Sequence, residues 1–106
     1  MDITGKIKAN RTRPAEIEGE EVFVKVYSFN LFKKTCETFQ GSDDKAIAAN
    51  LCDQFQDKDG KPVFTPEFIL SDDCPQCFVA ELIQLFAEVN TGAYGAKKKA
   101  MTRPHA

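Results

Sequence analysis

The sequence predicts a single α+β domain, in which a β-hairpin is followed by three helices and a short helical turn. Residues 14–27 alternate apolar and polar side chains, which is the period of a half-buried strand. Three later segments instead repeat apolar residues at spacings of three and four, which is the period of an amphipathic helix. A length of 106 residues, 42% of them hydrophobic and 28% charged, is typical of one globular domain.

The two ends of the chain differ in charge from its middle. Residues 1–13 carry a net charge of +3, and residues 93–106 carry +4. Residues 14–92 contain six basic and fifteen acidic residues, a net charge of −9. We expect residues 1–13 to form a flexible basic arm or an edge strand, residues 14–92 the domain, and residues 93–106 a disordered basic tail. An acidic domain repels phosphate, so nucleic-acid binding is not expected.

The hairpin and the first helix can be assigned to particular residues. Val22, Val24 and Val26 alternate with other residues, and Gly19 marks the turn of the hairpin. Ser28 is the predicted N-cap of the first helix, because its hydroxyl can accept from a free N–H group of the first turn. Apolar residues with helical spacing then run to Gly41, where we expect the helix to end: Phe29, Phe32, Cys36 and Phe39.

A second helix is predicted to begin at Ser42 as N-cap, with Asp43 and Asp44 at the positive end of the helix dipole. Its apolar stripe consists of Ile47, Ala48, Leu51, Cys52 and Phe55. The sequence DKDGKP at 57–62 predicts a turn, since Pro62 cannot continue a helix. It does not complete a calcium loop, because Phe55 and Pro66 would occupy the first and last ligand positions.

Two helical segments complete the domain. Thr65 as N-cap and Pro66 at the first helical position predict a helical turn over residues 66–70. The last helix is predicted to begin at Asp72 or Asp73 and to end at Asn90-Thr91-Gly92. Its apolar stripe is wide: Phe78, Val79, Leu82, Ile83, Leu85, Phe86 and Val89.

The sequence CPQC at 74–77 has the spacing of a redox dithiol and of half a zinc site. A helix start would lower the pKa of Cys74, but the preceding Asp72 and Asp73 would raise it. The 29 residues after Cys77 are too few for a thioredoxin-like sheet. Cys36 and Cys52 are expected in the core rather than as zinc ligands, and Cys77 in packing at the helix start. No metal or cofactor is therefore predicted.

Enzymatic activity is not predicted either. The single histidine, His105, is the penultimate residue, and no glycine-rich phosphate loop occurs. No run of 18 apolar residues suggests a membrane span, and the N-terminus lacks the apolar block of a secretory signal. We therefore expect a cytoplasmic protein with reduced cysteines that does not bind membranes.

Several segments together resemble the small tail assembly chaperones of long-tailed bacteriophages. The resemblance covers residues 15–92 and runs through EIEGEEVFVKVYSFNLFKKTCETF, AIAANLCDQFQ, DKDGKPVFTPEF and CFVAELIQLFAEVNTG. It departs from the family in two places: Asn90 and Gly92 are separated by Thr91, and CPQC is not part of the family pattern.

This resemblance implies a non-enzymatic role in the virion morphogenesis of a phage or prophage. Such chaperones bind the tape measure protein, keep it soluble, help recruit the major tail tube protein and are absent from the mature virion. Self-association along the long client is a further expectation. Residues expected to contact partners are apolar side chains of the last helix and of the turn before it: Phe64, Phe68, Leu82, Leu85 and Phe86. The alternative is a small redox or metal-binding protein that uses Cys74 and Cys77.

Overall fold

Three antiparallel strands form the sheet, in the order β1-β2-β3. The computed structural model describes residues 2–9 and 11–95. The hairpin is confirmed: β1 (Thr12–Ile17) and β2 (Glu20–Lys25) pair in the register Ala15↔Val22. Its two-residue turn places both Glu18 (φ 51°) and Gly19 (φ 79°) in the left-handed region, which matches the twist of a hairpin. The predicted α+β class is confirmed.

A third strand was not predicted. Phe55 ends the apolar stripe of the second helix in sequence, but its backbone is extended (φ −115°, ψ 122°). β3 (Phe55–Gln56) pairs with β2 through Val24↔Phe55 and Phe23↔Gln56. Period alone cannot separate a helix end from a two-residue strand, and pairing with β2 decided the outcome.

The helices have the predicted order, and most of their caps are confirmed. They are α2 (Phe29–Gln40), α3 (Asp44–Gln54), α4 (Pro66–Ile69) and α5 (Gln76–Thr91). Ser28 accepts from the Leu31 N–H at 3.2 Å, and Thr65 accepts from the Phe68 N–H at 3.2 Å. Gly92 closes α5 in the left-handed conformation, with φ 82°.

Two predicted helix starts are wrong. Asp43, not Ser42, caps α3, and its carboxylate accepts from the Ala46 N–H at 3.1 Å. The last helix begins at Gln76, with Pro75 as its N-cap, rather than at Asp72 or Asp73. A residue that precedes proline is held out of the helical region, so the chain up to Cys74 forms a turn.

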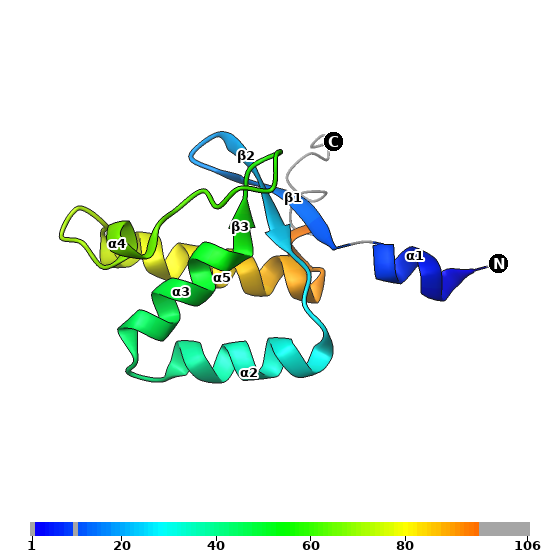
Figure 1. The fold of residues 1–106 in the computed structure, drawn as a ribbon, viewed down its shortest axis with the longest axis horizontal. Helices are drawn as coiled ribbons and strands as arrows, with labels where there is room; N and C mark the ends of the chain where they lie inside the picture. The colour runs from blue at the N-terminus through cyan, green and yellow to red at the C-terminus, as the bar shows by residue number, and fades with distance from the viewer. Residues whose placement is uncertain (1, 10, 96–106) are drawn as a thin grey trace, which may run out of the picture.

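The N-terminal segment also differs from the prediction of an arm or edge strand. α1 (Ile3–Ala9) is helical, and the Asp2 carboxylate accepts from the Gly5 N–H at 2.8 Å. Figure 1 shows α1 projecting away from the other elements, at the opposite end of the molecule from α4. Ile3 is exposed, so this apolar side chain of α1 adds little packing to stabilise so short a helix.

The segment after α5 packs against the edge of the sheet. Tyr94 is half-buried, and its hydroxyl accepts from the Glu16 N–H of β1 at 3.2 Å. The predicted disordered tail therefore does not begin at residue 93, while its remainder, residues 96–106, lies outside the described residues. Pro14 has no N–H, so this edge of β1 offers few free donors for another strand.

Helix α5 forms the centre of the core. It runs across the molecule behind α3 and β3, with α2 lying below it in Figure 1. Phe86 is fully buried, and its ring contacts Tyr27, Phe32 and Phe39 at centroid distances of 5.1, 5.7 and 5.9 Å. Val22 and Val24 of the sheet and Leu51 of α3 belong to the same core. Within the described ranges, no helix has the length and apolar character needed to cross a bilayer.

Candidate functional site

Exposed apolar side chains gather around the short helix α4. Val63, Phe68 and Leu70 are 39%, 38% and 47% exposed. Together with the half-buried Phe64, we call these residues the α4 surface. Large apolar side chains left open to water in one short segment mark a candidate interaction site.

The α4 surface is connected to the core by contacts between aromatic rings. Phe64 packs edge-on against the buried Phe55, at 6.2 Å, and against Phe78 of α5, at 5.5 Å. Its other contact is a stacked arrangement with Phe68, at 6.4 Å and an interplanar angle of 17°. These distances are those of favourable aromatic pairs. The exposed ring of Phe68 therefore has a rigid support.

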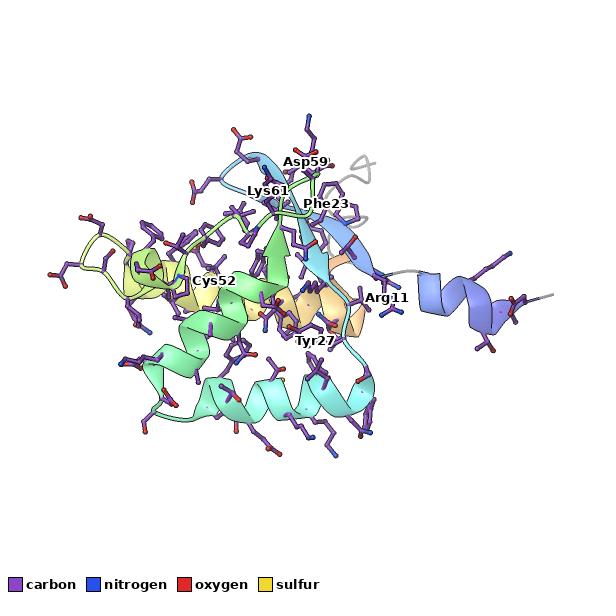
Figure 2. All side chains as sticks on the ribbon, viewed as in Figure 1. Arg11, Phe23, Tyr27, Cys52, Asp59 and Lys61 are labelled. Atoms are coloured by element: carbon purple, nitrogen blue, oxygen red, sulfur yellow. The ribbon has the colours of Figure 1, made fainter. Side chains whose placement is uncertain are left out.

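The charged residues nearest in sequence to Phe68 and Leu70 are negative. Residues 62–95 contain five acidic residues and no basic one: Glu67, Asp72, Asp73, Glu81 and Glu88. Glu67 lies close enough to Cys52 that its charge, after burial, raises the pKa of that thiol. Figure 2 shows Cys52 where α3 approaches α4. Phe68 and Leu70 are thus flanked along the chain by the acidic residues Glu67, Asp72 and Asp73.

The predicted partner-binding residues divide into two groups. Phe64 and Phe68 belong to the α4 surface, and Leu85 is half-buried on α5. The prediction is wrong for Leu82 and Phe86, which are 1% and 0% exposed and cannot contact a partner while the domain is folded. Both lie on the face of α5 that packs into the core.

Sequence reasoning missed Val63 and Leu70 as surface residues. Val63 follows the turn at 57–62, where its N–H donates to the Phe55 carbonyl at 3.1 Å and holds the backbone but leaves the side chain outside. Leu70 is the C-cap of α4, a helix so short that it buries Ile69 alone. One sequence pattern could have indicated that a residue here is exposed. Residues 68–70 are three consecutive apolar residues on a single helical turn, and they cannot all face the core.

A second pair of exposed apolar side chains lies at the start of α2. Phe29 is 76% exposed and Leu31 is 47% exposed. The Lys33 ammonium stands 5.3 Å from the centre of the Phe29 ring, a cation–π contact, and Lys34 follows it. We call Phe29 and Leu31 the α2 surface. Its immediate neighbours are basic, in contrast to those of the α4 surface.

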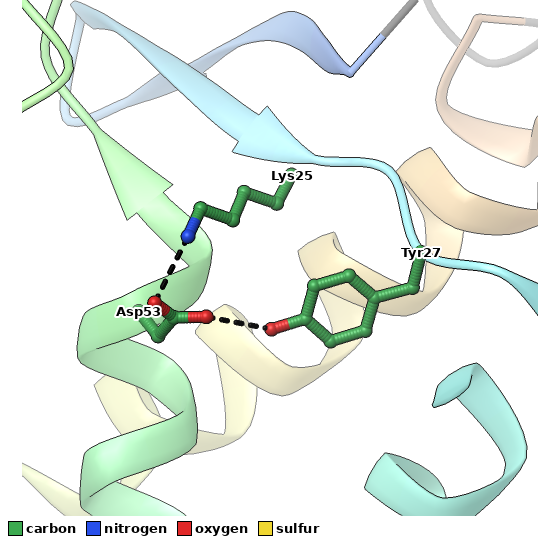
Figure 3. Close-up of polar contacts among 3 residues, drawn as sticks. All are labelled: Lys25, Tyr27 and Asp53. Carbon is green, nitrogen blue, oxygen red and sulfur yellow. Dashed lines mark hydrogen bonds and ion pairs between the residues drawn. The ribbon is translucent and has the colours of Figure 1, made fainter. Parts of the chain in front are cut away.

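An open cleft of about 550 Å³ lies between β2 and the start of α2. Three of its lining residues form the polar cluster of Figure 3, where Asp53 accepts from the Lys25 ammonium at 2.9 Å and from the Tyr27 hydroxyl at 3.1 Å. Burial, reinforced by the charge and hydrogen bond of Asp53, raises the pKa of Tyr27 to about 12. The phenol therefore stays protonated at neutral pH and acts as a donor. Figure 2 shows Asp59 and Lys61 far from this cluster, on the loop at the top of the view.

We expect the raised Tyr27 pKa to be directly measurable. In a Tyr94→Phe variant, Tyr27 is the remaining tyrosine, and its phenolate absorbance should appear at about pH 12 in the folded protein and near pH 10 in urea. Because the folded-state pKa is the higher one, its stabilising contribution is complete below pH 10 and is lost as the pH rises toward 12. Adding Asp53→Asn should lower the folded-state midpoint; an unchanged midpoint would contradict the role of Asp53.

In the cysteine pair at 74–77, the Cys74 thiol lacks the lowered pKa of a reactive thiol. Burial, and then the nearby Cys77, raises the pKa of the Cys74 thiol. Cys74 packs against the core, whereas Cys77 is exposed, contrary to the expected packing of Cys77. In the described part of the chain, no three His, Cys, Asp or Glu residues are placed to hold a metal ion together.

Comparison of the chain with protein-family models, with curated protein sequences and with solved structures gives no match.

Proposed function

We propose that this protein is a tail assembly chaperone of a long-tailed phage or prophage. It binds the tape measure protein, keeps it soluble and helps recruit tail tube subunits in the cytoplasm of the host, and it is absent from the mature virion. The role involves no catalysis and no cofactor. Self-association along the long client accompanies it.

The α4 surface is the observation that carries this proposal. A long chain with many apolar stripes requires transient cover, and Phe68 and Leu70 offer exposed apolar area on a rigid aromatic support. The acidic residues that flank these side chains in sequence, Glu67, Asp72 and Asp73, favour the solubility of this exposed area. The resemblance of residues 15–92 to the family supplies the identity of the client.

The raised thiol and phenol pKa values favour binding over chemistry. Cys52, Cys74 and Tyr27 all have pKa values above their usual range, so each stays protonated at neutral pH. A dithiol or general base would need the opposite shift or a value near neutrality. These directions support a role through surfaces and weigh against the redox alternative at Cys74 and Cys77.

Co-expression with a tape measure protein tests the proposal. The wild-type chain should shift the tape measure protein into the soluble fraction after centrifugation, and Phe68→Ser/Leu70→Ser should abolish this shift by removing about 2 kcal/mol or more of binding energy. The α2-surface variant Phe29→Ser/Leu31→Ser, which removes side chains that are at least as exposed, should retain it.

Two outcomes would contradict the proposal. If the tape measure protein is equally insoluble with and without this chain, the chaperone function fails. If Cys74→Ser/Cys77→Ser abolishes the solubilisation of the tape measure protein while circular dichroism shows a folded domain, the result would favour the dithiol alternative over binding through the α4 surface.

A further inference from the structure

The chemistry of the α4 surface specifies what kind of segment it binds. We propose that its ligand is a cationic amphipathic α-helix of the client, with apolar side chains along one face and Lys or Arg on both sides of that face. This inference rests on the proposed chaperone function and names the part of the client that is recognised.

Charge complementarity predicts the sign of the charge on the ligand. Phe68 and Leu70 are exposed within a 34-residue stretch that has five acidic residues and no basic one. Asp72 and Asp73 follow Leu70 after a single residue, Ser71; both are exposed and lie in the turn before α5. A ligand with acidic residues beside its apolar face would be repelled here, whereas lysine or arginine beside that face would be attracted.

The backbone near the α4 surface argues for a helix rather than an added strand. The outer side of β3 is already occupied by the returning chain, because Val63 donates to the Phe55 carbonyl at 3.1 Å and Asp57 donates to the Lys61 carbonyl at 2.8 Å. Gln56 and Pro62 form a β-bridge at the same place. Strand addition therefore has no free edge here, and recognition depends on side chains.

A cationic helix also fits the mixed character of the surface. Its apolar residues at positions i, i+3, i+4 and i+7 form a stripe that would pack against the exposed apolar side chains of this segment, above all the ring of Phe68. The aliphatic stems of flanking lysines extend this stripe, while their ammonium groups reach the acidic residues around it. The α2 surface would favour the opposite ligand charge, since Lys33 and Lys34 stand beside Phe29.

The test uses the purified full chain and three labelled 18-residue peptides in fluorescence anisotropy. The first peptide carries leucine at helical three-and-four spacing with lysine elsewhere, the second replaces lysine with glutamate, and the third scrambles the first so that its stripe is lost. We expect the lysine helix to bind at least about tenfold more tightly than the glutamate helix at low salt. The scrambled peptide should bind about tenfold more weakly than the lysine helix.

Matched charge variants separate a local effect from a general one. Asp72→Lys/Asp73→Lys should weaken binding of the lysine helix by about tenfold. Glu20→Lys/Glu21→Lys makes the same change in net charge on the exposed hairpin and should leave most of the binding intact. Phe68→Ser/Leu70→Ser should also lose binding, with folding of every variant checked by thermal unfolding.

Each contrary result overturns the inference. If the glutamate peptide binds as tightly as the lysine peptide, the ligand need not be cationic. If the scrambled peptide binds as tightly as the lysine peptide, the ligand need not be an amphipathic helix. If the two charge variants lose binding equally, Asp72 and Asp73 do not mark the binding site. Concentration-dependent self-association in sedimentation velocity, abolished by Asp72→Lys/Asp73→Lys, would make a second copy the occupant instead of a client.

The failures of the inference and of the proposed function are distinguishable. If the peptides do not discriminate but the chain still solubilises the tape measure protein, the chaperone function stands with another mode of recognition. If the peptides behave as expected and the tape measure protein remains insoluble, the ligand chemistry stands and the function fails.

Discussion

Replacing Phe86 with alanine is expected to lower the free energy of unfolding by about 3–5 kcal/mol. Phe86 is fully buried on α5, and its ring lies against Tyr27, Phe32 and Phe39 from the β2–α2 connection and from α2. Removing it leaves a cavity where the sheet, α2 and α5 meet. Small domains have about 5–15 kcal/mol of stability in total, so a large share would be lost.

Urea denaturation followed by circular dichroism measures this loss. Phe29→Ala is the matched control, because Phe29 is 76% exposed and its replacement should change the stability by less than about 0.5 kcal/mol. If Phe86→Ala lowers the free energy of unfolding by less than about 1 kcal/mol, Phe86 is not a major contributor to the stability of the core. Such a result would also reopen the interpretation of Phe86 as a partner contact.

The second large effect is expected at Asn90, where alanine should cost about 2–4 kcal/mol. The Asn90 side chain joins α5 to the end of β2: its oxygen accepts from the Tyr27 N–H at 2.7 Å, and its nitrogen donates to the Lys25 carbonyl at 3.1 Å. The same nitrogen also donates to the Phe86 carbonyl at 3.0 Å. Alanine would remove these partners from the Tyr27 N–H and the Lys25 carbonyl, which are partly buried, and that is costlier than the loss of a surface contact.

Thermal unfolding of Asn90→Ala and of Gln84→Ala gives the comparison. Gln84 lies on the same helix and hydrogen-bonds to Glu88 at an exposed site, so its replacement should change stability little. Similar losses in the two variants would contradict a special role of Asn90. Asn90→Asp should not rescue stability, since a carboxylate retains the acceptor for Tyr27 but would face the Lys25 and Phe86 carbonyls with a negative charge.

Asn90 also illustrates a residue whose position was noted in sequence but whose role was not. The sequence predicts Asn90 as part of a helix stop, and α5 does end one residue later, at Thr91. Its hydrogen bonds reach residues more than 60 positions away in sequence, and no local pattern contains that information. The residue is where the hairpin is fixed to the last helix.

The residues predicted to contact partners show the same difference between what local sequence predicts and what depends on tertiary packing. The α4 surface was partly predicted, since Phe64 and Phe68 lie next to a confirmed N-cap and a confirmed helical turn. Leu82 and Phe86 were misassigned because an apolar stripe identifies the buried face of a helix but not which of its residues remain exposed. The stripe on α5 does face the core, but only the structure shows that Leu82, Phe86 and Val89 are buried in it while Phe78, Val79, Ile83 and Leu85 are partly buried.

The sequence by itself determined the hairpin, the order of the helices and most of their ends. These features depend on contacts within about four residues, namely strand alternation, side-chain caps at Ser28 and Thr65, and the left-handed closure at Gly92. Only the tertiary structure decided that Phe55 leaves α3 to pair with Val24, that Tyr94 reaches the edge of β1, and that Phe68 and Leu70 stay open to water. The physical reason is that pairing and burial depend on segments that are distant in the chain, and their energies outweigh the weak local preferences of a two-residue strand or a one-turn helix.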